Sequence, residues 1–367
     1  MFIDSLTLNN FRNISNLKLV FDNPVTILYG VNGSGKTNIV ESIYLLSNAT
    51  SFRTTYFKEM IQNGKNESEI KGEIKTLNKK QTFKISLNKN GKIAYINDLL
   101  VNKVSDYIGK AIAVSFSPED VSLFKDSPGE RRHFLDKELS SLFPIYIKQL
   151  ITFKNVLDER NTLLKQKIDY DLLDVIDDKL IEASYDVYKR RNWLITKIIE
   201  FATQIYIDIT NQSQQIKIVY HTFLNEMDKQ QYYLKAKEIY KKSLKKDEEK
   251  MYTNVGIHKD DFKVFLNDME IDMFASQGQQ RLISLCMKLA VVEIIKKANK
   301  TEPIIILDDA FSELDSFKKK KLFNYILQKE QVFITCTDYK NIIDENKNNK
   351  VTLLHIKEGK VFERGSI

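Results

Sequence analysis

Hydrophobic and polar residues alternate near both ends of the chain, with a different periodicity between them. The alternation at 17–21 and the apolar run at 24–30 predict two strands, and the second leads directly into a glycine-rich loop. Residues 38–49 then place apolar side chains at helical spacing. Polarity alternates again over 66–101, where an Asn-Lys-Asn-Gly turn separates two segments, and this pattern predicts an antiparallel meander.

The middle of the chain has the periodicity of helices. Residues 145–255 contain neither glycine nor proline. Within 180–205 apolar residues recur every three or four positions, with Arg191 in the one gap of the series. We therefore predict an arm of about three to five helices, too short for a long coiled-coil rod. The lysine-rich stretch 241–250 is interpreted as a solvated helix end or loop.

Strand-like segments return from Gly256 onward. Because strands stand at both ends of the sequence with helices between them, we predict one α/β core that is split by an insertion. The predicted elements are a hairpin over 261–274, a helix over 276–298, buried strands over 302–309 and 331–337, and a hairpin over 351–363. The predicted domains are an N-terminal part of the core at 1–125, an inserted helical arm domain at 126–255, and a C-terminal part of the core at 256–367.

Composition narrows the class of protein only a little. The chain is 43% hydrophobic and 29% charged, as in ordinary globular proteins, and no apolar run is long enough to cross a bilayer. The first residues lack the layout of a secretory signal, and the two cysteines form neither a metal-binding nor a disulfide pattern. We expect a cytoplasmic protein without a membrane partner. The net charge of +7 is compatible with a polyanionic partner but does not diagnose one.

The glycine-rich loop at 30–37 reads GVNGSGKT and matches the phosphate-binding loop pattern. Its backbone N–H groups can wrap a phosphate chain, Lys36 can reach the β- and γ-phosphates, and the Thr37 hydroxyl can bind Mg²⁺. The alternative, a glycine-rich turn, is disfavoured because the loop joins a strand to a helix. The sequence therefore predicts ATP and Mg²⁺ as cofactors. The candidate nucleotide-binding residues are Gly30, Val31, Asn32, Gly33, Ser34, Gly35, Lys36, Thr37 and Asn38.

A second half of this site is predicted where the apolar run at 304–307 ends in two acids. Asp308 can hold Mg²⁺ directly or through water, and Asp309 can orient or deprotonate the attacking water. The alternative is an acidic pair that caps a helix or forms a turn. The phosphate-binding loop itself calls for an acid-tipped strand, which favours the metal and catalytic roles.

The segment FASQGQQR at 274–281 opens an apolar helix some thirty residues before the acid-tipped strand. A helix N-terminus with a serine and a glycine can bind the γ-phosphate that another subunit presents. The alternative is a simple helix cap formed by Ser276. The spacing is that of the signature of ATP-binding-cassette (ABC) proteins, and SELD at 312–315 matches their loop that meets the opposing subunit. The candidate residues are Ser276, Gln277, Gly278 and Gln279 for the signature, and Ser312 and Asp315 for the loop.

These motifs give the chain a resemblance to the RecF family of DNA replication and repair proteins, which belongs to the ABC-type ATPases together with the SMC proteins. The resemblance runs nearly end to end. GIHKDD departs from the family pattern, because Ile257 and Lys259 stand where proline and arginine are usual. The motifs in family order are NNFRN (9–13), GVNGSGKTN (30–38), SFRT (51–54), FSPED (116–120), GERRHFLD (129–136), DERNTLLK (158–165), GIHKDD (256–261), ASQGQQR (275–281), ILDDAFSELD (306–315) and FITCTD (333–338).

The resemblance implies the fold and several further site residues. The expected fold is an ABC-type P-loop ATPase head, with a mixed sheet, flanking helices and an antiparallel β subdomain, plus the inserted arm. Arg53 is expected near the nucleotide base or phosphates, although it could instead cover the first helix. Arg131 and Arg132 are candidates for DNA contacts or for salt bridges between domains. Lys259 is a further candidate DNA contact.

Three departures from ABC ATPases in general favour slow hydrolysis that acts as a timer. Asp309 stands where a catalytic glutamate is usual, one methylene shorter. The segment 335–338 lacks the switch histidine, and no glutamine stands in the loop that would sense Mg²⁺, where FSPED is the candidate replacement. The resemblance therefore implies a weak, DNA-stimulated ATPase.

The functional hypothesis is an ATP-gated homodimer that clamps double-stranded DNA. Two ATPs would lie between two heads, closure would bring the arms around a duplex, and lysine and arginine side chains would grip phosphates without reading bases. Hydrolysis would open the dimer. The resemblance also implies recombinational repair and the SOS response, binding near single-strand gaps and junctions, cooperation with RecR and RecO, and help in RecA loading.

Three other classes of protein share parts of this pattern. An ABC transporter ATPase subunit is disfavoured by the long helical insertion and the absent switch histidine. An SMC-like DNA-organising ATPase is disfavoured by the short arm, and an ATPase-coupled nuclease by the roughly fifty residues that follow SELD. DNA repair remains the favoured function.

Overall fold

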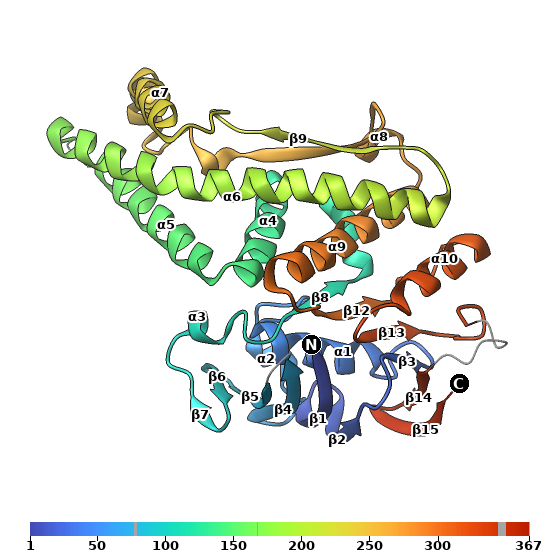
Figure 1. The fold of residues 1–367 in the computed structure, drawn as a ribbon. Coiled ribbons are helices and arrows are strands. Elements are labelled where there is room, and N and C mark those ends of the chain that lie inside the picture. Colours follow the sequence, from blue (N-terminus) through green and yellow to red (C-terminus); the bar gives the residue numbers. More distant parts are fainter. Residues whose placement is uncertain (77–78, 167, 344–349, 367) are drawn as a thin grey trace. The chain divides into compact units, whose positions relative to one another are not determined.

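The computed structural model describes residues 1–76, 79–166, 168–343 and 350–366 (Figure 1). It divides into two compact units. The predicted boundaries differ from these units, because 200–214 belong to the first unit and 256–275 to the second. The head unit comprises 1–121, 200–214 and 276–367, and the arm unit comprises 122–199 and 215–275.

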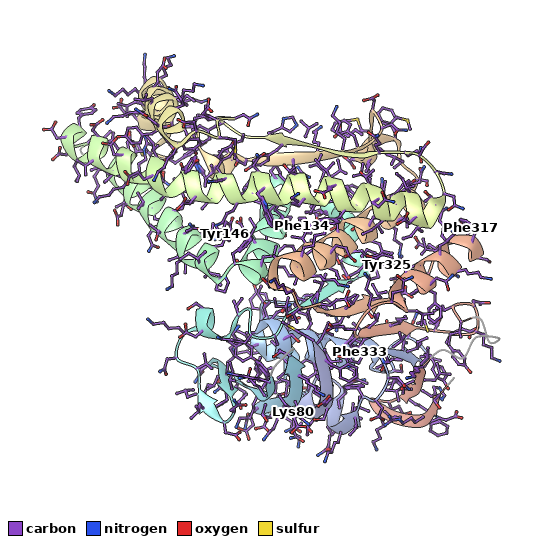
Figure 2. The ribbon with its side chains drawn as sticks, viewed as in Figure 1. Lys80, Phe134, Tyr146, Phe317, Tyr325 and Phe333 are labelled. Atoms are coloured by element: carbon purple, nitrogen blue, oxygen red, sulfur yellow. The ribbon has the colours of Figure 1, made fainter. Side chains whose placement is uncertain are left out.

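The centre of the head unit is a six-stranded sheet with the order β15-β14-β3-β13-β12-β8. The strands from β14 to β8 are parallel, and β15 pairs antiparallel with β14. Every residue of β12 and β13 is buried, as expected for apolar strands covered on both faces. Phe333 in β13, for example, packs edge-on against Phe21 with ring centroids 4.9 Å apart (Figure 2). The bounds are β3 Val25–Tyr29, β8 Ala113–Phe116, β12 Ile304–Asp308, β13 Val332–Cys336, β14 Val351–Lys357 and β15 Lys360–Ser366.

The topology of this sheet places the predicted motifs at one edge. The phosphate-binding loop follows β3, Asp309 follows β12, and FSPED overlaps the end of β8. Because β3, β13, β12 and β8 are parallel neighbours, their carboxyl ends lie at the same edge of the sheet. The fold therefore brings these predicted motifs to one edge of the sheet, and their roles in binding stay predictions.

A second sheet of the head unit is antiparallel, with the order β2-β1-β4-β5-β6-β7. Buried and exposed residues alternate along it, for example in β2 and β4, so one face is packed and the other is solvated. The predicted meander over 66–101 is confirmed. The bounds are β1 Phe2–Phe11, β2 Ile14–Val20, β4 Glu67–Thr76, β5 Lys79–Asn88, β6 Gly91–Ile96 and β7 Leu99–Leu100.

Two helices of the head unit were predicted, one over 38–49 and one over 276–298, and they correspond to α1 and α9, whereas α2, α3 and α10 were not predicted. α1 follows the phosphate-binding loop and is buried over most of its length, and α9 follows Ser276. The bounds are α1 Lys36–Asn48, α2 Phe57–Met60, α3 Val104–Tyr107, α9 Gln277–Asn299 and α10 Ser316–Ile326, with a 3₁₀ helix η1 at Pro118–Phe124.

The arm unit contains helices and a small sheet. The described part of 145–255 contains the helices α5, α6 and α7, which agrees with the predicted number of about three to five. The strand β9 in the same stretch was not predicted. β9 pairs with β10 over its full length, and β11 pairs over two residues before the chain turns into α8, where a longer strand was expected. The bounds are α4 Pro128–Leu142, α5 Pro144–Leu164, α6 Tyr170–Thr210 (whose residues from 200 belong to the head unit), β9 Ile216–His221, α7 Lys229–Lys250, a 3₁₀ helix η2 Ile257–Lys259, β10 Asp261–Leu266, β11 Met269–Glu270 and α8 Ile271–Phe274.

Arg191, the polar gap in the apolar series of α6, is the centre of a buried network in the arm unit. Its side chain is 3% exposed and donates to both carboxylate oxygens of Asp136, at 2.9 and 3.0 Å, and to the Ile257 carbonyl at 2.8 Å. Tyr146, which is labelled in Figure 2, also donates a hydrogen bond to Asp136, at 2.5 Å. Because each charge has a partner, the burial of Arg191 is tolerated, and loss of one partner would be costly.

Arg160 forms a second buried network in the same unit. It donates to Asp177 at 2.6 Å, to Asp247 at 2.7 Å and to the Thr253 hydroxyl at 2.9 Å. These contacts join α5, α6 and α7 with the segment before η2.

Among the described residues, no helix is long and apolar enough to cross a membrane.

Candidate functional site

The phosphate-binding loop has backbone conformations that require glycine at two positions. Gly30 has φ +145°, and a Cβ there would lie 2.4 Å from the Ile356 carbonyl oxygen. Gly35 has φ +109°, and a Cβ there would lie 3.2 Å from Cα of Gly359. Any side chain at either position would therefore strain the loop or push it away from its support.

The turn between β14 and β15 supports this loop from behind. The Gly359 N–H donates to the Ser34 carbonyl at 2.7 Å. Asn13 lies next to Gly359, and its side chain donates to the Gly33 carbonyl at 3.5 Å and accepts a hydrogen bond from Asn38 at 2.8 Å. This support was not predicted from the sequence, because Gly359 is far along the chain and belongs to no phosphate-binding motif.

Lys36 is the first residue of α1 and points back into the loop. Its ammonium donates to the carbonyls of Gly30 and Val31, at 2.7 and 2.9 Å. Burial lowers the pKa of Lys36, and the neighbouring Cys336, Asp308 and Asp309 oppose this effect. The first turn of α1 contains no acidic residue, so its positive end is open to an anion.

Asp308 and Thr37, the two predicted metal ligands, lie side by side. The Thr37 hydroxyl donates to Oδ1 of Asp308 at 2.8 Å, and the Thr335 hydroxyl donates to the same oxygen at 2.5 Å. Asp308 is 6% exposed; burial raises its pKa, while the hydrogen bonds from Thr335 and Thr37 lower it. One carboxylate and one hydroxyl fit Mg²⁺, which takes few protein oxygens when phosphates and water complete its shell. The described residues include no cluster of three acids, histidines or cysteines suited to a metal held by protein alone.

Asp309 has a fixed backbone and an exposed carboxylate. Its φ of +51° is left-handed, a conformation that aspartate tolerates better than most residues. The N–H donates to Thr335 Oγ1 at 3.0 Å, and the carbonyl accepts from the Ser312 hydroxyl at 3.0 Å and from the Arg281 guanidinium. The side chain is 47% exposed. The residue is thus held by its main chain while its carboxylate faces solvent, and its catalytic role stays a prediction.

Ser276 forms the N-terminal cap of α9. Its hydroxyl accepts from the Gln279 N–H at 3.3 Å, and the Gln279 side chain accepts from the Ser276 N–H at 2.9 Å, which completes a capping box. Ser276 and Gln277 are exposed, while Gly278 and Gln279 are half-buried. The cap is confirmed as local structure, and the role of these residues toward a second subunit stays a prediction.

The SELD loop follows Asp309 and begins the next helix. Asp315 caps α10 by accepting from the Lys318 N–H at 2.9 Å, and its carboxylate also pairs with the Lys318 ammonium at 2.7 Å. Ser312 points back to the carbonyl of Asp309. Both candidate loop residues therefore have local structural roles, and contact with an opposing subunit stays a prediction.

A buried polar face of α9 connects the two loops beside Asp308. Arg281 lies 3.4 Å from Glu313 in the SELD loop and 3.6 Å from the Asp309 carboxylate. One turn and two turns further, Ser284 donates to the Asp120 carbonyl at 3.0 Å and Lys288 pairs with the Asp120 carboxylate at 3.1 Å. These residues were not predicted as part of the site, although three polar positions on one face of an otherwise apolar helix are a usable signal.

Arg53 lies against α1. Its guanidinium donates to Asn38 at 2.9 Å and to Glu41 at 3.1 Å, and its side chain is 37% exposed. Glu41 is fully buried and also accepts two hydrogen bonds from Arg12, at 3.0 and 2.7 Å. These contacts match the alternative in which Arg53 covers the first helix, and its contact with nucleotide stays a prediction.

The three candidate DNA contacts lie in the arm unit and differ in their surroundings. Arg131 donates to both carboxylate oxygens of Asp261, at 2.5 and 2.8 Å, and Arg132 donates to the Asp260 carbonyl at 2.6 Å. Lys259 is exposed, with its ammonium 5.1 Å from the Tyr252 ring centroid. Arg131 therefore forms a salt bridge, but within the arm unit and not between domains as predicted, and Lys259 is the more accessible candidate.

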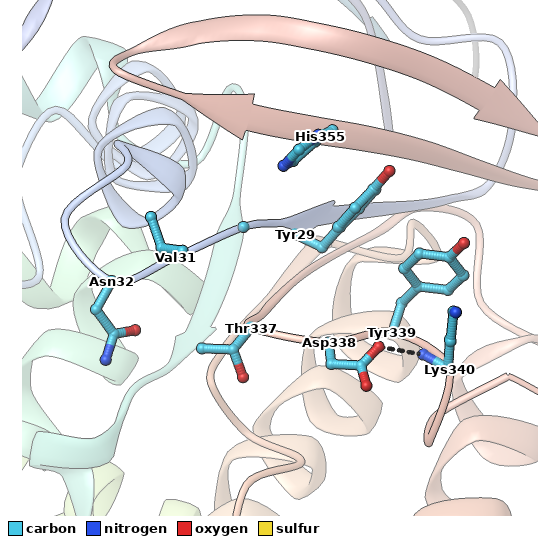
Figure 3. A pocket seen from close by; sticks show the side chains of 9 residues that line it. Tyr29, Val31, Asn32, Thr337, Asp338, Tyr339, Lys340 and His355 are labelled. Atoms are coloured by element: carbon cyan, nitrogen blue, oxygen red, sulfur yellow. Dashed lines mark hydrogen bonds between the residues drawn. The ribbon is translucent and has the colours of Figure 1, made fainter.

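A pocket of about 590 Å³ opens beside the phosphate-binding loop (Figure 3). Tyr29 stacks on His355 with centroids 4.8 Å apart and meets the Tyr339 ring edge-on at 4.7 Å. In the segment that contains Tyr339, the Lys340 N–H donates to the Asp338 side chain at 3.0 Å (dashed in Figure 3). The segment expected to carry a switch histidine thus forms one wall of this pocket. The lining residues are Tyr29–Asn32, Thr337–Lys340 and His355.

Comparisons with known proteins place the chain among relatives of one family. A family model described as the RecF/RecN/SMC N terminal domain matches residues 2–122. The chain is 40% identical over 372 residues to the DNA replication and repair protein RecF of Clostridioides difficile (strain 630), with 99% of this chain and 98% of the relative covered. It is 36% identical to the protein of the same name from Bacillus cytotoxicus, with 98% of each covered.

Solved structures give the same result for the fold. A structure of the recombination mediator protein RecF with ATP has a TM-score of 0.88 at 28% identity, covering 100% of this chain and 97% of the other. The RecF-ATPrS structure has a TM-score of 0.87 at 30% identity, with 98% and 97% covered. An Smc head domain from Pyrococcus furiosus has a TM-score of 0.58 at 15% identity, covering 100% and 96%, which is a likeness of fold alone.

Proposed function

Because the chain belongs to the RecF family of DNA replication and repair proteins, we propose that it acts as an ATP-driven homodimer that clamps double-stranded DNA near single-strand gaps. Membership of this family makes it an ATP-binding ATPase of DNA repair. The observation that carries the proposal is the pairing of Thr37 with Asp308 at 2.8 Å beside Lys36, in a chain whose Ser276 helix end is exposed.

The residues of one chain would hold the phosphates and the metal. The Lys36 ammonium would exchange the Gly30 and Val31 carbonyls, which it now contacts, for β- and γ-phosphate oxygens. Thr37 and Asp308 would hold Mg²⁺, which when bound neutralises charge on the β- and γ-phosphates. The exposed carboxylate of Asp309 would orient the attacking water and accept its proton.

The second chain would complete the site with its α9 terminus. Ser276, Gln277 and Gly278 would present a hydroxyl, amides and the positive helix end to the γ-phosphate. ATP then links dimerisation to nucleotide binding, because it contacts both chains only in the closed dimer. Slow hydrolysis would remove this link and release DNA.

The DNA-bound state would depend on phosphate contacts. Exposed basic side chains such as Lys259 would neutralise phosphates without reading bases, so binding would weaken as salt rises. A solved RecF structure is described as part of a RecFOR pathway. We extend this to the present chain, with RecR and RecO as partners and RecA loading at gap edges as the outcome.

The proposal is tested by sedimentation and DNA-binding measurements with and without ATP. The wild-type chain should dimerise and retain duplex DNA only with ATP, and Lys36→Arg should bind ATP but hydrolyse it slowly. Ser276→Arg should bind nucleotide yet stay monomeric, because the long side chain blocks the helix end. Ser366→Arg, at an exposed serine of β15, is the matched control and should behave as wild type. Dimerisation without ATP would contradict the clamp.

A further inference from the structure

We infer that the hydroxyl of Thr335 is a positioning group that holds both acids of the nucleotide site. Thr335 lies in β13, where the sheet register pairs it with Asp308 of β12, and it is 1% exposed. Its Oγ1 donates to Asp308 Oδ1 at 2.5 Å and accepts the Asp309 N–H at 3.0 Å. The inference rests on the proposed nucleotide site, in which Asp308 holds the metal and Asp309 handles water.

One hydroxyl can do this because it is both a donor and an acceptor. A threonine hydroxyl has a single proton and two lone pairs. Since the Asp309 N–H points at one lone pair, the proton of Thr335 is left for the carboxylate of Asp308. Serine could form the same pair of bonds. Valine has the same shape but would leave the Asp309 N–H without this acceptor and Asp308 without its shortest donor.

Thr37 cannot replace Thr335 in this role. Thr37 also donates to Asp308 Oδ1, at 2.8 Å, but it belongs to α1 and its oxygen is itself the proposed metal ligand. Thr335 is part of a buried strand and has no second duty toward the metal. It therefore fixes the carboxylate from the sheet side, while Thr37 depends on what occupies the phosphate-binding loop. A supporting donor of this kind orients a metal-binding carboxylate and tunes its affinity.

The same hydroxyl helps to hold Asp309 in its left-handed conformation. The carbonyl side of Asp309 is bound by Ser312 and Arg281, and Thr335 binds its N–H. Even for aspartate the left-handed conformation is less favourable than an ordinary one, and these contacts help to keep it at φ +51°. Without the Thr335 bond, Asp309 can relax toward an ordinary conformation, and its carboxylate would then point elsewhere.

The test compares three variants of the full chain. Thr335→Val removes the hydroxyl, and Thr335→Ser keeps it. Thr26→Val is the matched control, because Thr26 is a fully buried threonine of β3 whose hydroxyl has no hydrogen-bond partner in the described part of the chain. Each protein is titrated with a fluorescent ATP analogue, first in EDTA and then at rising MgCl₂, and ATP hydrolysis is measured in parallel.

We expect Thr335→Val to bind the analogue in EDTA within about twofold of wild type. Its half-saturating Mg²⁺ concentration should rise by about tenfold or more, and hydrolysis should fall by a similar factor, as when a supporting contact of a metal ligand is lost. Thr335→Ser should stay within about threefold of wild type in every readout. Thr26→Val should be unchanged.

Three results would overturn the inference. The Mg²⁺ dependence of Thr335→Val could equal that of wild type, or Thr335→Ser could be as impaired as Thr335→Val. A loss of analogue binding in EDTA as large as the loss in Mg²⁺ would also overturn it, since that reports damage to the loop and not to the metal site. Failure of the wild-type chain to bind nucleotide would overturn the proposed function and this inference together, whereas the other outcomes concern Thr335 alone.

Discussion

The nucleotide edge of the head unit and the arginine networks of the arm unit both bury charge, but they balance it differently. In the arm unit, Arg191 and Arg160 each pair with carboxylates that neutralise them. In the head unit, Asp308 is equally buried but receives only hydroxyl donors, and within the described residues no basic side chain forms an ion pair with it. A buried charge with internal partners is tolerated in the fold and is costly to unpair, whereas a buried carboxylate without a cationic partner is a candidate to bind a cation.

The largest effect should come from breaking the arm network. Arg191→Met would leave Asp136 partly buried without its cation, and we expect a loss of about 3–5 kcal/mol in the free energy of unfolding. Urea unfolding followed by the fluorescence of Trp193, the one tryptophan of the chain and part of the arm unit, measures this loss. Arg190→Met, which removes an arginine next to it in sequence, is the control and should lose far less. Equal losses would show that Arg191 acts only through packing.

The matching change in the head unit should alter catalysis and not stability. Asp309→Asn keeps the backbone contacts to Thr335, Ser312 and Arg281 but removes the proposed proton acceptor. We expect steady-state ATP hydrolysis to fall by about a hundredfold, within the range for loss of a general base, with the melting temperature nearly unchanged. Unchanged hydrolysis would remove Asp309 from the mechanism.

The arm unit also contains two buried groups whose titration should have opposite signs. Burial lowers the pKa of His258 to about 4, and burial raises the pKa of Asp260 to about 6. Between pH 6.5 and 4 the unfolded chain protonates this histidine and the folded chain does not, so the group makes folding less stable as pH falls. Between pH 6 and 3.8 the folded chain protonates Asp260 first, so that group makes folding more stable as pH falls.

Two variants separate these contributions. Relative to wild type, the stability of His258→Gln should rise by about 2 kcal/mol when pH falls from 6.5 to 4.5, and that of Asp260→Asn should fall over the same window. Urea unfolding of the three proteins at pH 6.5, 5.5 and 4.5 gives the comparison. Parallel stability curves for wild type and both variants would contradict the two pKa shifts.

The smallest expected effect concerns the support of the phosphate-binding loop. A Cβ at Gly359 would lie 2.9 Å from the Asn13 carbonyl oxygen, whereas Gly64 has a similar positive φ and no atom within 4 Å of such a Cβ. Alanine at either position should cost about 1 kcal/mol of stability through backbone strain. Only Gly359→Ala should also weaken nucleotide binding, by severalfold. Equal nucleotide affinities in the two variants would show that the turn between β14 and β15 does not determine the conformation of the phosphate-binding loop.

The sequence predicted those parts of the site whose signals are local. The phosphate-binding loop, the acid-tipped strand and the start of α9 each lie within a few residues, and each was found where predicted. Thr335, Arg281 and Gly359 were missed as supports because their partners are distant in the sequence, and only the sheet register or helix packing brings them together. For Thr335 and Arg281 the sequence signal was a polar side chain within an otherwise apolar strand or helix.

The domain boundaries show the same limit. The segment 256–275 was predicted with the core, yet it lies in the arm unit because β10 pairs with β9. β9 went unpredicted since it stands in a stretch without glycine or proline that was interpreted as helical throughout. The helical periodicity of α6 likewise continues past residue 200, where the chain passes from the arm unit into the head unit, so no local signal marks that boundary.

The most direct test of the central claim mixes two inactive chains. Lys36→Ala has a defective phosphate-binding loop and an intact α9 terminus, and Ser276→Arg has the reverse. If each site is built from two chains, both proteins alone should fail to hydrolyse ATP, and an equimolar mixture should recover activity because a mixed dimer contains one complete site. A mixture as inactive as its components, while wild type hydrolyses ATP in the same assay, would contradict the shared site and with it the ATP-driven dimer.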